Sequence, residues 1–254
     1  MIGNCNEKVL GTVDSSSITY NLYSSRNKVD GTKGRSEKNT TKSILPSTIF
    51  APTKEPPKYT IVLDAGHGGF DPGKVGVNGA KEKDINLAIV QKLKTLLEQE
   101  NIRVVLTRET DVALYEETDS NKKASDLKNR VKKIEEAKAD FAISIHQNSF
   151  TDGSSHGAQV FYYETSEEGK KFAELMQETI KSSVADGNHR VAKANASYYL
   201  LKKTSGLLII VECGFLSNAS EADLLITEEY QQKMAEAVRD GILAYLKQAD
   251  AEQE

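Results

Sequence analysis

The chain has 254 residues, of which 38% are hydrophobic, and a formal net charge of −4 at pH 7. This length is enough for one domain with a buried core, and the mildly acidic balance provides no basic surface for nucleic acid. The two cysteines, Cys5 and Cys213, form neither a disulfide framework nor a CxxC pair. A zinc site built from several thiolates is therefore excluded, and any metal site must use His, Asp or Glu.

The first 57 residues differ in composition from the rest of the chain. They are rich in Ser, Thr, Asn and Lys, which is typical of a linker or a partly disordered extension, with one weak strand near 18–23. The prolines of "APTKEPPK" mark the boundary. We expect an extension over 1–57, a compact domain over 58–248 and a tail over 249–254. No apolar run is long enough to span a membrane, and the residues after Met1 lack a signal-peptide core.

Strand and helix patterns alternate through the compact part. In chain order we predict a strand at 59–64, a helix at 84–98 with Asp84 as its N-cap, a strand at 102–108, a helix at 127–137, strands at 140–148 and 157–163, a helix at 167–183, short and long strands at 198–202 and 207–215, and a closing helix at 229–246. Continuous apolar strands separated by helices indicate a single α/β domain. The expected sheet is twisted and mostly parallel, with about six strands and helices on both faces.

Three predicted strands end in ionisable residues followed by a loop. "IVLDAGH" ends near His67, "AISIHQN" carries His146, and "LIIVECG" carries Glu212. The carboxyl ends of parallel strands meet at one edge of a sheet, so these side chains could converge there. Two imidazoles and a carboxylate, with another carboxylate from "GAKEKD", match the ligand set of a catalytic zinc site.

Each of these residues also has a plain structural interpretation. His67 lies among glycines and could be a turn residue, whereas His146 ends an apolar run and would need a partner if buried. Glu212 is the strongest candidate, because a carboxylate inside "LLIIVECGFL" loses hydration unless a cation or a donor compensates. Glu82 alone resembles the solvated start of a helix. Cys213 follows Glu212 on the same strand, so we expect it on the opposite face, inert in the core.

Other candidate sites fit the sequence less well. His156 and His189 lie in polar loops and are expected at the surface, although His189 and Arg190 could contact an anionic substrate. The dinucleotide pattern GxGxxG would need glycine in place of Asp71, and the chain contains neither GxxxxGK[ST] nor GxSxG.

Several motifs occur together in a fixed order. They are "IVLDAGHGG.DPG", "GAKEKDINL", "LTR..D", "L..R", "ISIHQNS", "GAQVFYY" and "VECGFLSN". As a set they resemble the zinc-dependent N-acetylmuramoyl-L-alanine amidases, which cut the amide between glycan and peptide in the bacterial cell wall, over nearly all of residues 59–246. "SIHQNSF" and "VECGFLSN" are most similar to the sporulation- and germination-specific subgroup, which acts in forming muramic-δ-lactam in spore cortex.

The resemblance implies roles for particular residues. His67, Glu82 and His146 would bind one Zn²⁺ per chain, and Glu212 would be the catalytic acid/base. Asn148 would help to position the substrate. This chain departs from the usual family pattern at Gln147 and Ser149, which flank that asparagine. Gln147, His189 and Arg190 complete the candidate substrate-binding set.

The resemblance also implies partners and a location. The substrate would be peptidoglycan glycan strands with stem peptides, outside the cytoplasmic membrane, which requires export by a signal that this sequence does not contain. A monomer is expected, and a protein activator cannot be identified from the sequence. The segment between the second predicted strand and the second helix is too short for the inhibitory helix of some relatives. Two alternatives remain, a metal-dependent peptidase of the stem peptide and an inactive wall-binding module.

Overall fold

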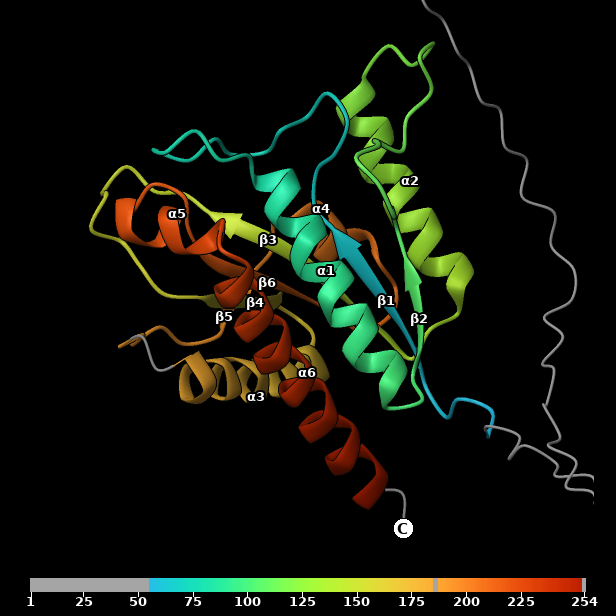
Figure 1. Ribbon diagram of the computed structural model, residues 1–254. Coiled ribbons are helices and arrows are strands. Elements are labelled where there is room, and N and C mark those ends of the chain that lie inside the picture. Colours follow the sequence, from blue (N-terminus) through green and yellow to red (C-terminus); the bar gives the residue numbers. More distant parts are fainter. Residues whose placement is uncertain (1–54, 185–186, 253–254) are drawn as a thin grey trace, which may run out of the picture. The chain divides into compact units, whose positions relative to one another are not determined.

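The computed structural model describes residues 55–184 and 187–252, which form an α/β domain (Figure 1). Residues 1–54, including Cys5 and the predicted strand at 18–23, lie outside the described part of the chain. The predicted mostly parallel six-stranded sheet is confirmed. Its strands are β1 (Thr60–Ala65), β2 (Arg103–Leu106), β3 (Phe141–Asn148), β4 (Gln159–Tyr163), β5 (Lys193–Asn195) and β6 (Leu208–Phe215).

The sheet has the order β2-β1-β3-β6-β4-β5. The first four strands of this order are parallel to one another, and β4 pairs antiparallel with β6 while remaining parallel to β5. The strand direction in the sheet therefore changes between β6 and β4. The carboxyl ends of β1, β3 and β6, which carry the candidate ligands and acid/base, lie side by side at one edge.

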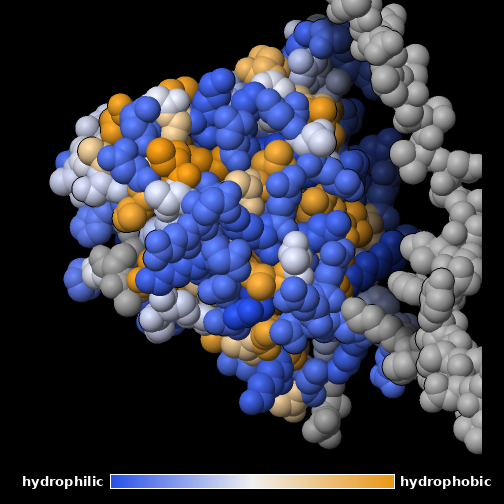
Figure 2. Space-filling view, viewed as in Figure 1, coloured by the Kyte–Doolittle hydropathy of each residue, from blue (hydrophilic) through white to orange (hydrophobic). Residues whose placement is uncertain are grey.

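Helices cover both faces of the sheet. They are α1 (Glu82–Gln99), α2 (Lys122–Ala137), α3 (Glu167–Val184), α4 (Tyr199–Lys203), α5 (Ala219–Leu225) and α6 (Glu228–Ala251). Side chains of α1, α3 and α6 pack in the larger hydrophobic cluster, whereas α2 and α4 pack against the smaller cluster on the other face. Figure 1 shows α1 and α6 on the same face of the sheet, and the outward surface of this side is mainly hydrophilic (Figure 2).

Alternation along the strands decides which side chains can meet. Val62 of β1, Ala142 of β3 and Ile210 of β6 belong to the cluster below α2 and α4. Residues two positions further along each strand point to the same face, and these are Asp64, Ser144 and Glu212. Cys213 lies fully buried in the opposite cluster, as predicted.

Two local predictions are wrong. Residues 198–202 were expected to form a strand, but Tyr199–Lys203 is the helix α4, and β5 lies just before it. The side chain of Asn195 accepts hydrogen bonds from the backbone N–H groups of residues 197 and 198, which turns the chain into this helix. Asp84 is not the cap of α1, because the backbone N–H groups of residues 84 and 85 already donate to the carbonyl of Lys81. The helix therefore begins at Glu82.

Helix boundaries account for the other differences. Helix α2 starts at Lys122 rather than at residue 127, since the side chain of Asn121 caps it by accepting from the Ala124 N–H at 3.0 Å. Helix α5 was not predicted, and Asn218 caps it in the same way. Helix α6 continues to Ala251. Within the described residues, none of these helices has the length and apolar character needed to cross a membrane.

Candidate active site

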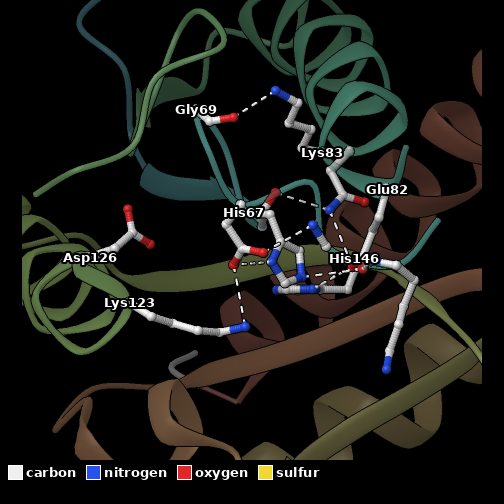
Figure 3. A network of polar contacts seen from close by, with 12 residues as sticks. His67, Gly69, Glu82, Lys83, Lys123, Asp126 and His146 are labelled. Carbon is white, nitrogen blue, oxygen red and sulfur yellow. Dashed lines mark hydrogen bonds and ion pairs between the residues drawn. The ribbon is translucent and has the colours of Figure 1, made fainter. Parts of the chain in front are cut away.

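Three of the predicted site residues form one cluster at the carboxyl edge of the sheet. His67 lies in the loop after β1, Glu82 is the first residue of α1, and His146 lies near the end of β3. One nitrogen or oxygen from each residue lies within 4.8 Å of the others. Glu82 is central, with Oε2 3.2 Å from His67 Nε2 and Oε1 2.8 Å from His146 Nδ1. Figure 3 shows the three side chains pointing toward one another.

His67 is held in an unusual backbone conformation. Its φ of 61° lies in the left-handed region, which non-glycine residues seldom adopt. Its Nδ1 lies 2.9 Å from Asp71 Oδ2, and Arg130 Nη2 donates to its carbonyl oxygen at 2.5 Å. The adjacent Gly66 allows the ring of His146 to approach, because a Cβ there would lie 2.2 Å from that ring. These contacts direct Nε2 of His67 toward the cluster.

Arg108 links the two segments that carry His67 and Glu82. Its side chain is 2% exposed and donates from Nη2 to the carbonyl oxygens of Gly66 at 3.1 Å and Lys83 at 2.8 Å. Its Nε also donates to the carbonyl of Ala65 at 2.9 Å. One planar guanidinium can hold several acceptors in a fixed geometry, so Arg108 fixes the loop after β1 relative to the start of α1.

Glu82 is a buried carboxylate with many donors. It is 2% exposed, and besides the two imidazoles it accepts from the backbone N–H of Lys74 at 2.8 Å and of Gln147 at 3.1 Å. Burial would raise its pKa, but the hydrogen bonds from His146 and His67 outweigh burial and hold the pKa far below the usual range. The same contact raises the pKa of His146 to about 9, although burial of the ring acts in the opposite direction. Glu82 is therefore an anion at neutral pH.

Glu212 lies beside this cluster without being tied to it. Its position on β6 is paired with His146 on β3, and it is 7% exposed. Its Oε2 is buried and has no hydrogen-bond partner among the described residues. Burial raises the pKa of Glu212 to about 7. The negative charge of Glu82 adds to this increase, and the charge of His146 opposes it. A carboxyl group with this pKa can both take up and release a proton near neutral pH.

The cluster fits a divalent metal ion of the zinc type. Two imidazoles and one carboxylate are a common protein ligand set for catalytic Zn²⁺, with metal–ligand distances of about 2.0–2.2 Å. Ligand atoms within 4.8 Å of one another are compatible with that geometry. The contact between Asp71 and Nδ1 of His67 matches the hydrogen-bonded carboxylate that commonly orients a ligating histidine.

The cluster opens into a cleft of about 450 Å³. Its lining includes the three candidate ligands, Glu212, Asn148 and Tyr198. Burial, together with the negative charges of Glu212 and Glu82, raises the pKa of the Tyr198 phenol to about 12, so this hydroxyl keeps its proton. The cleft is large enough for part of an extended substrate with a reactive bond at its floor.

The remaining predicted residues have different positions. Gln147 belongs to the cleft lining, but the residue is 2% exposed and its side chain donates to Asn86 Oδ1 on α1 at 3.1 Å. His189 is exposed and Arg190 donates to the His156 carbonyl at 2.7 Å, so neither belongs to the cleft lining. His156 is exposed, as predicted.

Sequence reasoning did not assign four residues that shape the site: Asp71, Lys74, Arg108 and Arg130. Three of them fall within motifs that carried the family resemblance, "DPG", "LTR" and "L..R". Those motifs were the available signal, but composition and spacing do not specify the distant partners of the arginines, which are backbone carbonyls and, for Arg130, also the carboxylate of Asp64. Lys74 lies in the loop between His67 and Glu82 and lines the cleft.

Comparison with known proteins identifies the family of the chain. The sequence profile of the N-acetylmuramoyl-L-alanine amidase family matches residues 61–244. The germination-specific N-acetylmuramoyl-L-alanine amidase of Bacillus subtilis is 38% identical over 188 residues, which is 73% of this chain and 78% of the relative. The AmiA amidase of Escherichia coli K12 is 30% identical over 233 residues, 74% of this chain and 76% of the relative.

The fold also matches solved structures. The CwlD amidase of Clostridioides difficile, solved in complex with the GerS lipoprotein, is 42% identical and superposes with a TM-score of 0.72 over 74% of this chain and 98% of that one. These matches confirm the resemblance seen in the motifs. The chain therefore belongs to the N-acetylmuramoyl-L-alanine amidase family and is a hydrolase that acts on peptidoglycan.

Proposed function

We propose that this amidase is zinc-dependent and cleaves the amide between the lactyl group of N-acetylmuramic acid and L-alanine. His67, Glu82 and His146 would hold one Zn²⁺, and Glu212 would be the general acid/base. One observation carries the proposal. Glu212 lines the same cleft as the cluster of His67, Glu82 and His146. Its Oε2 is buried and has no hydrogen-bond partner among the described residues.

The chemistry divides between the ion and the protein. When bound, Zn²⁺ would lower the pKa of a water molecule toward about 7 and polarise the lactyl carbonyl. Glu212 then takes a proton from the attacking water on Oε2 and passes it to the nitrogen of the departing L-alanine, as the C–O bond forms and the C–N bond breaks. Tyr198 and Asn148 line the same cleft as Glu212 and would contact the substrate there.

Product analysis with metal removal tests this proposal. Incubation with purified muropeptides should release the whole stem peptide, with L-alanine at its amino terminus, and leave the lactyl carboxylate on the glycan. Dialysis against a chelator should abolish release, and one equivalent of Zn²⁺ should restore it. A stem peptide shortened at an internal bond would identify a peptidase instead, and an absence of products from zinc-loaded protein would identify a binding module.

Arg108 provides a prediction for metal binding that is independent of turnover. Because its guanidinium joins the carbonyls of Gly66 and Lys83, Arg108→Met should let the His67 and Glu82 segments separate. We expect the zinc affinity, measured by competition with a chromogenic chelator, to fall about 10- to 100-fold. Lys133→Met is the matched control, since among the described residues Lys133 Nζ donates only to the Thr107 carbonyl, at 2.7 Å. Equal zinc affinity in the two variants would contradict this role.

The finer biological role follows from the relatives. We infer action on spore cortex, because a germination-specific amidase and the CwlD amidase are among the similar proteins. Peptidoglycan lies outside the cytoplasmic membrane, which supports an extracytoplasmic location and export. The CwlD structure contains a lipoprotein, which supports a protein partner for this chain as well. Muropeptide profiles of cortex from cells lacking the gene should lose muramic-δ-lactam, and an unchanged profile would refute the cortex role.

A further inference from the structure

We propose that Lys74 selects stem peptides with a free carboxylate close to the scissile amide, by pairing its ammonium group with that carboxylate. The inference rests on the proposed amidase function, and it concerns charge selectivity rather than the cleavage step. The relevant carboxylate is the α-carboxylate of the second stem residue, which peptidoglycans carry either free, as isoglutamate, or amidated, as isoglutamine.

The backbone of Lys74 is fixed against a candidate metal ligand. Its N–H donates to Glu82 Oε2 at 2.8 Å, and its carbonyl accepts from the Glu82 N–H at 2.9 Å. The preceding Gly73 has φ of 68°, and a Cβ there would lie 2.5 Å from Glu82 Oε2, so the chain packs against the carboxylate at a position that favours glycine. The Lys74 side chain therefore starts next to the cluster at which the amide would be cleaved.

The side chain itself is not committed to a protein partner. Lys74 lines the cleft and is exposed. Among the described residues that line this cleft it is the only lysine or arginine. Within the same part of the chain no carboxylate lies within ion-pair distance of Nζ, whereas Lys83 of the same region is paired with Asp111 at 2.6 Å. A cation left unpaired at the edge of a reaction cleft is available to an anionic substrate group.

The chemistry of the substrate matches this position. Cleavage places the L-alanine nitrogen at the cluster, and the carboxylate of the second stem residue lies only one residue beyond it. The side chain of lysine is long and flexible and carries three N–H donors. The Lys74 backbone is hydrogen-bonded to Glu82, so this side chain begins beside the cluster. Lys74 lies in the same cleft as the bond to be cleaved, and its positive charge is complementary to a carboxylate on the peptide side of that bond.

A two-by-two comparison tests the inference. The zinc-loaded protein is assayed with two muropeptides that differ only in isoglutamate or isoglutamine at the second stem position. Wild type should prefer the isoglutamate form, and Lys74→Met should reduce this preference in kcat/KM about 3- to 10-fold, chiefly through KM. The ratio of kcat/KM for the two muropeptides is the readout, because any effect of Lys74→Met on the cleavage step itself applies equally to both forms.

Lys81→Met provides the control for a general effect of positive charge. Lys81 pairs with Val75 across a backbone bridge in the same loop and is exposed, but it does not line the cleft. Its replacement should leave the preference unchanged. Two results would overturn the inference while leaving the proposed function intact. One is that wild type and Lys74→Met cleave both muropeptides with the same preference between them, and the other is that Lys81→Met loses as much of the preference as Lys74→Met. Cleavage of neither muropeptide by wild type would overturn the proposed function and the inference with it.

Discussion

Replacement of Glu212 by glutamine should abolish most of the hydrolysis while leaving metal binding intact. Glu212 lies beside the cluster, but its Oε2 has no partner among the described residues, so it is available for proton transfer and not for fixing the ligands. Glutamine keeps the size of the side chain and cannot accept a proton at neutral pH. We expect kcat on muropeptides to fall about 10²- to 10⁴-fold, with zinc stoichiometry by elemental analysis equal to that of the wild type.

The contrasting variants are His67→Ala and Glu82→Ala. Each removes a member of the cluster, so each should lose activity together with the metal. Glu212→Gln with near wild-type turnover would contradict the assigned role, and so would loss of zinc from this variant.

Stability measurements give a second readout for Glu212. Burial raises its pKa from 4.5 to about 7. The ionised carboxylate therefore lowers the free energy of unfolding, whereas a neutral glutamine at this position would not. This cost is absent below the unfolded pKa, grows between about pH 4.5 and pH 7, and persists above pH 7. With chelator present, the free energy of unfolding of Glu212→Gln should exceed that of the wild type at pH 8, and the difference should shrink toward pH 4.5. A difference that grows on acidification would contradict the raised pKa.

The sequence was most informative where burial and spacing impose one solution. The continuous apolar runs before His146 and Glu212 indicated strands of a sheet covered on both faces, and the expected parallel arrangement predicted that their carboxyl ends could converge. The structure pairs these two positions on β3 and β6. Alternation along β6 also placed Cys213 on the opposite face, where it is fully buried.

Prediction failed where the deciding contacts are distant or aperiodic. Residues 198–202 contain adjacent tyrosines and leucines, which match neither the helical nor the strand periodicity. The turn at Asn195 and the burial of Leu200 and Leu201 favour the helix α4. Glu82 was assigned by resemblance alone, since an acidic residue in "KEKD" is typical of a solvated helix start. Its burial depends on His146 and the Gln147 N–H, which come from β3.

Arg130 shows the same limit most clearly, and its replacement should have the largest effect on stability. The residue occurs in a basic amphipathic helix and would be expected in solvent, yet it is 2% exposed. Its Nη1 donates to Asp64 Oδ1 at 2.8 Å, 66 positions away in the sequence, and its Nε donates to Asp126 Oδ2 at 2.6 Å. Asp64 is fully buried and also accepts from Ser144 and Thr107.

Arg130→Met should therefore leave the Asp64 carboxylate buried without its cation. Burial alone would raise the pKa of Asp64, but Arg130 and the two hydroxyl donors lower it from 3.8 to about 2. Removing one partner of a buried ion pair typically costs about 3–5 kcal/mol, which we expect in the free energy of unfolding from urea titrations at pH 7 with chelator present. Lys132→Met is the matched control on α2, because Lys132 pairs with Glu136 at 3.8 Å in solvent, and such pairs contribute at most about 1 kcal/mol.

The pH dependence of this loss identifies its cause. A lowered pKa means that the ionised Asp64 stabilises the native protein fully above about pH 3.8, and that this contribution is lost as the pH falls toward 2. In Arg130→Met the carboxylate lacks its cation, so protonation relieves the unpaired charge. The difference in unfolding free energy between the wild type and Arg130→Met should consequently be largest near pH 7 and should shrink as the pH is lowered toward 3. A constant difference across this range would indicate that Arg130 stabilises the fold by packing and by its bonds to the carbonyls of Ala65 and His67 rather than by its charge.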